Sequence, residues 1–265
     1  MIWYNIYIKL GVNLLVLKYT LKKEDGNIRL KYILKNKLHI SSKLLLKLKN
    51  NKCIFVNNKP CLVNNTVYEK DIVTVYLDNI DKDSKLSIPA YNSNLNIIYE
   101  DEYILVLDKP SNLEVHPSMN NYDKTLANMV MGYYLEKEYN INKIHIVTRL
   151  DKDTSGICVI AKNEYVQELF IRKKEEVNFQ KEYIAVVNGI VKNDHDIIEK
   201  NISRKNGSII VREVNNTGDY AKTEYFVINR NIDKNYTCLK ILLHTGRTHQ
   251  IRVHLAFLGH VLLRR

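Results

Sequence analysis

The hydrophobic positions in the first third of the chain predict a small module of helices and strands. Residues 41–49 carry three leucines on one side at helical spacing, with Ser41 or Ser42 as the N-cap. Lys43 and Lys47 share the other side of this helix, where we expect them to face open solvent. The other elements expected here are a helix over 28–34 and strands over 53–56 and 72–77.

Farther along the chain, short apolar runs dominate. A polar stretch that contains Pro89 indicates a linker, so we expect domains at residues 1–82 and 97–265, joined by residues 83–96. Because the strand runs cluster late and do not alternate strictly with helices, the pattern favours an α+β fold with a mixed sheet. Strands are expected over 97–99, 103–107, 156–161, 183–188, 208–214, 222–228 and 237–243, and helices over 126–139 and 165–174.

The charge of the chain indicates a polyanionic partner. Its 265 residues include 40 Lys+Arg and 29 Asp+Glu, a net charge of +11, which favours nucleic acid through counterion release and steering. Residues 26–68 contain no acidic residue and nine basic ones. We therefore expect this module to bind RNA, through Arg29, Lys43, Lys47, Lys49 and Lys52.

Membrane and metal-binding classes receive little support. Apolar stretches such as Leu14 to Leu17 are far shorter than the roughly 20 residues of a spanning helix. The first residues lack the small-residue cleavage site of a signal peptide, so we expect a cytoplasmic protein without membrane contact. The four cysteines are scattered with no CxxC pair, which predicts neither a zinc ribbon nor a disulfide framework.

Two polar segments carry the side chains for chemistry. Residues 148–156 place Asp151, Asp153, a cation and small hydroxyl residues before an apolar strand. Since the same residue types build ordinary turns, this segment alone favours a structural turn. Residues 245–254 offer many donors and no acid at a strand-to-helix corner, which suits phosphate or a carboxylate partner. Their two histidines are five apart without an intervening Glu, so the zinc-helix motif is not met.

Three segments resemble the motifs of the RluA-type pseudouridine synthases, in the same order. They are RLDKDTSG at 149–156, KEYIAVVNG at 181–189 and HTGRTHQIRVHLAFLGH at 244–260. The segments KPSNLEVHPS at 109–118 and TLANMV at 125–130 resemble the entry segment of that family, and residues 27–78 resemble the S4 RNA-binding domain. The resemblance implies an isomerase that converts uridine to pseudouridine in structured RNA, above all large-subunit ribosomal RNA. It also implies a monomer that needs no cofactor.

The resemblance implies a role for each matching residue. Asp151 is expected to be the catalytic aspartate, Tyr183 the ring stacked on the target base and Arg252 the ionic partner of Asp151. A carboxylate beside the ribose can attack C1′ or remove a proton from C2′, and both routes stay open. Because stacking hides the reacting bonds, the base must first be extruded. The expected substrate contacts are Arg149, which enters the gap left by the base, Arg247, His249 and Gln250.

Two departures from the family pattern qualify the resemblance. Thr148 stands where the family usually has His, a change we expect to be tolerated. After Gly259 and His260 the family continues into further strands, whereas this sequence stops at Arg265, so we expect an incomplete catalytic sheet.

Two other functions remain open. One is an RNA-binding protein that has lost catalysis, and the other is a hydrolase with Asp151 and Asp153 as its acid/base pair.

Overall fold

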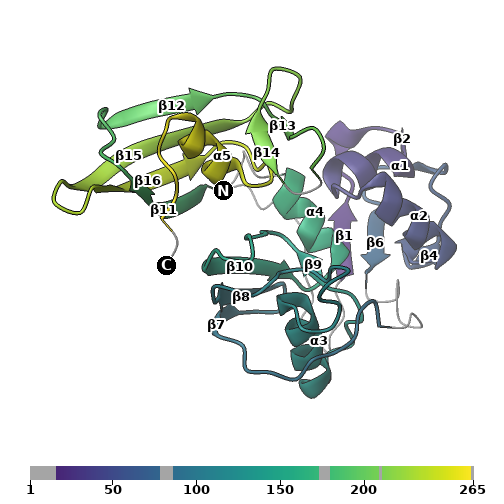
Figure 1. Cartoon of the computed structure of the whole chain (residues 1–265). Coiled ribbons are helices and arrows are strands. Elements are labelled where there is room, and N and C mark those ends of the chain that lie inside the picture. Colours follow the sequence, from purple (N-terminus) through teal and green to yellow (C-terminus); the bar gives the residue numbers. More distant parts are fainter. Residues whose placement is uncertain (1–15, 78–85, 173–179, 209–210, 264–265) are drawn as a thin grey trace. The chain divides into compact units, whose positions relative to one another are not determined.

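The computed structural model describes residues 16–77, 86–172, 180–208 and 211–263 (Figure 1). The chain divides between Lys174 and Glu175 into two compact units. Both units combine helices with sheets, which confirms the combination of α and β elements expected from the sequence. The expected mixed sheet is not found among the described residues, where neighbouring strands pair antiparallel. Among the described residues, no helix has both the length and the apolar character to cross a bilayer.

The first part of unit 1 is a four-stranded antiparallel sheet with helices packed against it. Its strand order is β1-β6-β3-β4. Helix α2 begins as predicted, because Ser41 Oγ accepts a hydrogen bond from the Leu44 N–H at 3.0 Å. The elements are β1 (Val16–Thr20), η1 (Lys23–Asp25), β2 (Ile28–Arg29), α1 (Leu30–Tyr32), η2 (Ile33–Lys37), α2 (Ser42–Asn50), β3 (Ile54–Val56), β4 (Lys59–Pro60), β5 (Thr66–Val67) and β6 (Ile72–Tyr76).

The first predicted helix starts later than expected. Ile28 and Arg29 form strand β2, which pairs with β5, and the helical turns run through α1 and η2 instead. The reason is tertiary: the next N–H groups, of Leu30 and Lys31, also bond to carbonyls of the 63–65 segment. A partner so distant in sequence overrides the local helical pattern.

The second part of unit 1 is another antiparallel sheet, of order β7-β8-β10-β9. Residues 87–91, expected to be a linker, run along α3, where Tyr91 N–H donates to the Asn128 carbonyl at 3.0 Å. The approach is close enough that a Cβ at Gly132 would lie 2.6 Å from the Tyr91 oxygen. The elements are β7 (Ile97–Glu100), β8 (Ile104–Lys109), α3 (Leu126–Glu136), β9 (His145–Ile146), β10 (Gly156–Ala161) and α4 (Glu164–Arg172).

Helix α4 joins the two parts of unit 1. Tyr165 is buried within the same core as the leucines of α2, and its hydroxyl donates to the Leu38 carbonyl at 3.0 Å. Arg172 donates to the His39 carbonyl at 3.1 Å. The basic N-terminal module and residues 86–172 therefore pack as one unit, and the division between units falls after residue 174 rather than within 83–96.

Unit 2 is built on a four-stranded antiparallel sheet of order β11-β16-β15-β12. Helix α5 packs on one face of this sheet, where Leu255 joins its core (Figure 1). Beside β11, Leu262 pairs with Val187, so residues 261–263 lie along the outer edge of that strand. The elements are β11 (Lys181–Asn188), β12 (His195–Glu199), β13 (Ile202–Arg204), β14 (Arg212–Val214), β15 (Lys222–Asn231), β16 (Tyr236–Leu243) and α5 (Gln250–Phe257).

Candidate active site

Asp151 lies in the loop that connects β9 to β10 in unit 1. The loop closes on itself through a hydrogen bond from the Thr154 N–H to the Asp151 carbonyl at 3.1 Å. Thr148 is buried at its start, and its hydroxyl accepts a hydrogen bond from the Val159 N–H at 2.8 Å. Thr148 thus ties the loop to β10, which gives the residue a structural role at the position where the family pattern has His.

A buried lysine, Lys109, anchors the loop that carries Asp151 through hydrogen bonds. Lys109, at the end of β8, is 0% exposed, and its ammonium donates to the Pro110 and Leu113 carbonyls at 2.8 Å and to the Lys152 carbonyl at 3.0 Å. Burial lowers the pKa of Lys109, while the nearby charges of Asp153 and Asp151 act in the opposite direction. Three carbonyl acceptors match the three donors of an ammonium group. The Lys109 side chain therefore anchors the loop.

Ser111 adds a second link, since its hydroxyl donates to the Asp153 carbonyl at 3.1 Å. The loop backbone on the C-terminal side of Asp151 is therefore held at two successive residues, 152 and 153. Sequence analysis missed both anchors. The only signal was their place in the 109–118 segment, which the resemblance marked without giving either residue a role. Arg149, in the same loop, is exposed.

Tyr183 and Arg252 both belong to unit 2. Tyr183 lies on β11 opposite Ile241 and packs partly buried against the core of the unit. It shares a face of the sheet with Ala185 and Val187, the face on which α5 packs. This position fits a strand aromatic that packs partly buried against the core of unit 2.

Helix α5 is fixed to β15 by a polar network around Thr223. Gln250 is 2% exposed; its amide nitrogen donates to Thr223 Oγ1 at 2.9 Å and to the Lys222 carbonyl at 3.0 Å. Its amide oxygen accepts from the Thr245 hydroxyl and the Arg247 N–H. With both ends of its amide engaged, Gln250 has a structural role, and the expectation that it contacts substrate is corrected.

His254 completes the network. Its Nε2 lies 3.0 Å from the Lys200 carbonyl and its Nδ1 lies 2.9 Å from Thr223 Oγ1. Because a carbonyl can only accept, the neutral ring carries its proton on Nε2, and the Thr223 hydroxyl donates to Nδ1. Gln250 and His254 are one turn apart and face the sheet, so Arg252, two residues from each, projects from the other side of α5.

We expect the stability of unit 2 to depend on the protonation of His254. Burial lowers the pKa of His254 from its ordinary value of 6.5, so the unfolded chain binds this proton more readily. The contribution of neutral His254 to the free energy of unfolding is therefore complete above pH 6.5. It is lost as the pH falls below 6.5, at up to about 1.4 kcal/mol per pH unit. Urea unfolding between pH 7.5 and 5 should show a shallower pH slope in His254→Gln. Parallel slopes in the two proteins would contradict this.

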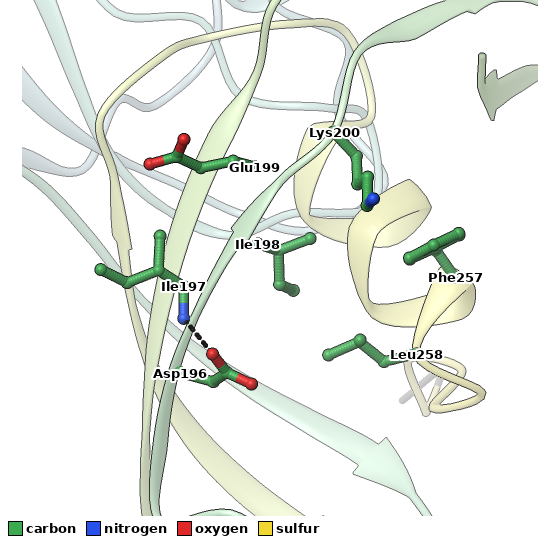
Figure 2. Close-up of a pocket in the computed structure, with 7 residues that line it drawn as sticks. All are labelled: Asp196, Ile197, Ile198, Glu199, Lys200, Phe257 and Leu258. Atoms are coloured by element: carbon green, nitrogen blue, oxygen red, sulfur yellow. Dashed lines mark hydrogen bonds between the residues drawn. The ribbon is translucent and has the colours of Figure 1, made fainter. Parts of the chain in front are cut away.

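The other predicted substrate contacts lie near the start of α5. Arg247 is exposed; its Nε donates to the Tyr220 carbonyl at 3.0 Å, and its Nη1 lies 3.8 Å from Asp219. His249 precedes the helix with φ 58°, a left-handed conformation that non-glycine residues seldom adopt. A separate cavity of about 340 Å³ lies between β12 and the end of α5 (Figure 2). None of the predicted catalytic or substrate-binding residues lines it.

Of the two α2 lysines expected to face solvent, Lys43 does so, with a side chain 77% exposed, but Lys47 does not. Lys47 and Lys43 both pair with Glu164, the first residue of α4, with Lys43 Nζ 3.2 Å from the carboxylate. Burial acts to raise the pKa of Glu164, but the two lysine hydrogen bonds outweigh it, so the pKa is lowered. The expectation of a lysine face open to solvent is therefore wrong for Lys47, whose side chain is 25% exposed. Arg29, Lys49 and Lys52 are exposed.

We expect Lys47→Met to lower the free energy of unfolding by about 1–2 kcal/mol, because it removes a charged hydrogen bond from a largely buried carboxylate. Lys49→Met, on the same helix but exposed, is the matched control and should be nearly neutral. Equal urea midpoints for the two variants would show that the bond to Glu164 does not hold α2 against α4.

The comparisons with known proteins converge on one family. Residues 103–257 match the family described as RNA pseudouridylate synthase. An uncharacterized RNA pseudouridine synthase of Aquifex aeolicus is 39% identical over 188 residues, which cover 70% of this chain and 59% of that protein. The uncharacterized synthase YhcT of Bacillus subtilis is 32% identical over 241 residues, 91% of this chain and 78% of the relative.

A third relative carries a name that includes its RNA. It is the ribosomal large subunit pseudouridine synthase D of Blochmanniella floridana, 35% identical over 215 residues, 80% of this chain and 66% of the relative. The chain thus spans less than two thirds of the length of the first and third of these relatives.

The fold itself is shared with a solved structure. Human RNA pseudouridylate synthase domain containing 1 superposes with a TM-score of 0.52 at 23% identity, over 66% of this chain and 69% of that one. The matched family segment, residues 103–257, includes Asp151, Tyr183 and Arg252. The chain belongs to the RNA pseudouridylate synthase family.

Proposed function

We propose that this protein converts uridine to pseudouridine in structured RNA. The observation that carries the proposal is the family match over residues 103–257, a span that holds all three predicted catalytic residues. In the reaction the N1–C1′ bond breaks, a C5–C1′ bond forms, and the proton lost from C5 is balanced by one gained at N1. The product is an isomer, so the reaction needs no oxidant, reductant or co-reactant.

Asp151 is the proposed group that acts at the ribose, by attack on C1′ or by removal of the C2′ proton. Its loop suits either route, because the anchors at Lys152 and Asp153 fix the backbone next to the carboxylate. Such preorganisation lowers the entropic part of a barrier. Arg252 is proposed as the ionic partner that orients the carboxylate. Asp151 belongs to unit 1 and Arg252 to unit 2.

Large-subunit ribosomal RNA is the proposed substrate, and an S4-like module over residues 27–78 is the proposed second RNA contact. The name of the Blochmanniella floridana relative supports the first proposal. The exposed Arg29, Lys49 and Lys52 support the second, since lysine and arginine contacts to phosphate supply affinity without sequence information. Pseudouridine mapping in ribosomal RNA from cells with and without the gene tests both the reaction and the substrate. Identical maps would contradict the proposal.

Tyr183 is proposed to stack on the target base, since a flat ring can hold the detached uracil while it turns. We expect Tyr183→Phe to keep RNA affinity, because stacking survives, and to lose turnover only if the phenol accepts the C5 proton. Tyr183→Ala should weaken binding of the flipped base by about 1–3 kcal/mol. Single-turnover rates and affinities for one RNA check this, and an Ala variant with unchanged affinity and rate would remove Tyr183 from the site.

A further inference from the structure

Unit 2 contains a polar pocket lined by two arginines, Arg212 and Arg247. Its volume is about 190 Å³, and it opens beside the turn that leads into α5. The lining residues are Ile202, Arg212, Asp219, Gly246, Arg247 and Thr248. Arg247 was an expected substrate contact, but nothing in the sequence singled out Arg212.

The β13–β14 hairpin places two arginines directly opposite each other. Arg204 pairs with Arg212 in its antiparallel register, so both side chains leave the same face of the hairpin. Like charges in this arrangement are destabilising. Of the residues on this face, Ile202 and Arg212 line the pocket, whereas Arg204 is exposed and does not. An anion between the guanidinium groups would remove the repulsion.

Arg212 also carries an unsatisfied donor. Its Nε is buried and has no hydrogen-bond acceptor within the described part of the chain. A buried N–H without a partner costs about 1–3 kcal/mol, so the site is less stable empty than filled by an acceptor. Arg212 lines the pocket, where an oxyanion would supply that acceptor.

The opposite wall adds positive potential. The Arg247 Nε donates a hydrogen bond to the Tyr220 carbonyl, which orients the guanidinium group. The Nη groups carry further N–H donors that can bind a ligand. A Cβ at Gly246 would lie 3.6 Å from Lys181 Nζ, so a third cation is close to the turn. Among the described residues of the lining, Asp219 is the one carboxylate; it lies 3.8 Å from Arg247 with its side chain 75% exposed, and a single carboxylate does not neutralise both Arg212 and Arg247.

We propose that this pocket binds a phosphate group of the RNA backbone. The inference rests on the proposed function for the identity of the ligand and on Arg212 and Arg247, which both line the pocket, for the site. Planar guanidinium forks match phosphate oxygens, and the partial positive charge at the start of α5 acts in the same direction. None of the described residues that line the pocket has an aromatic ring on which a base could stack, which favours the backbone over a base as the bound group.

The test combines RNA binding with an ion probe. We expect Arg212→Gln to weaken binding of a structured large-subunit RNA fragment about tenfold at low salt. It should also reduce the slope of log affinity against log salt by about 0.7–0.9, the value of one phosphate contact. Lys234→Gln, an exposed charge change at the β15–β16 turn, is the control and should leave both unchanged.

Inorganic phosphate serves as the second probe. At constant ionic strength it should raise the melting temperature of the wild-type chain relative to chloride, and Arg212→Gln should abolish that shift. Without any anion, Arg212→Gln should melt no lower than the wild type, because it removes an unsatisfied donor and a repulsive pair. A clear loss of stability would assign Arg212 a purely structural role and overturn the inference. Arg212→Lys, which keeps the charge, should retain the salt slope.

The outcomes separate this inference from the proposed function. If the wild type forms pseudouridine but Arg212→Gln keeps its salt slope, the RNA phosphate site is overturned and the proposed function stands. If Arg212→Gln loses the slope while the wild type forms no pseudouridine, the phosphate site stands and the catalytic proposal fails. Loss of the phosphate shift with an unchanged RNA slope would mean a site for a free anion and would overturn the assignment to RNA.

Discussion

Asp151→Asn should reduce pseudouridine formation by at least about 10³-fold, because the amide keeps the shape of the side chain but can act neither as a nucleophile nor as a base. RNA affinity should stay close to that of the wild type. The loop anchors explain why the fold should tolerate the change: the bonds to residues 152 and 153 use backbone carbonyls, not the Asp151 side chain. Single-turnover assays with saturating RNA measure the rate, and filter binding measures the affinity.

Asp153→Asn is the matched control for this prediction. Asp153 is exposed in the same loop, and its backbone carbonyl, which the substitution leaves in place, is what Ser111 contacts. We expect a near-normal rate from this variant. Equal loss in both variants would instead favour a hydrolase with two cooperating carboxylates, and that enzyme would release free uracil. An Asp151→Asn variant with substantial activity would remove Asp151 from the central role.

Lys109→Met should have the largest effect on stability, with a loss of about 2–4 kcal/mol in the free energy of unfolding. The methionine fills the space of the lysine stem but leaves three carbonyls without their donor, and unsatisfied buried groups are costly. The Lys152 carbonyl is one of them, so the loop that carries Asp151 loses its main anchor. Turnover should therefore fall at temperatures where the variant is still folded, while RNA affinity changes little.

Lys162→Met provides the comparison. Lys162 follows the other end of β10, and its ammonium pairs with Glu100 at 2.7 Å with a side chain only 10% exposed. Removing the Lys162 ammonium should also destabilise unit 1, but it should leave the rate of pseudouridine formation unchanged. A Lys109→Met protein that is folded and turns over normally would show that this lysine supports the fold alone and does not position the loop.

The elements that could be predicted are those whose local pattern and tertiary surroundings agree. Helix α2 has an N-cap, a leucine face and a core to pack against, and it lies where the sequence predicts it. Strand β10 is a short apolar run after a turn and was also predicted with its bounds. Strands β12 and β13 were missed because polar residues alternate irregularly through residues 195–204. Their stability comes from pairing with β15 and β14.

The residues of the candidate site also fall into two groups, those that the sequence predicts and those whose role depends on the fold. Motif resemblance predicts Asp151, Tyr183 and Arg252 as catalytic residues, but the supporting residues depend on partners distant in the chain. Lys109 reads as a surface lysine until the fold buries it under the Asp151 loop. Gln250 reads as a substrate contact until Thr223 occupies its amide, and Lys47 reads as an RNA contact until α4 brings Glu164 to it. Spacing along a sequence carries no information about such partners.

The central claim is tested most directly by incubating the purified chain with an unmodified transcript of large-subunit ribosomal RNA. Pseudouridine is then mapped by a chemical label that distinguishes it from uridine, and free uracil is measured in the same reaction. The account predicts pseudouridine at discrete positions, no released uracil, and loss of the signal with Asp151→Asn but not with Asp153→Asn. Two results would contradict this prediction: RNA that is bound but contains no pseudouridine, or release of free uracil from the RNA.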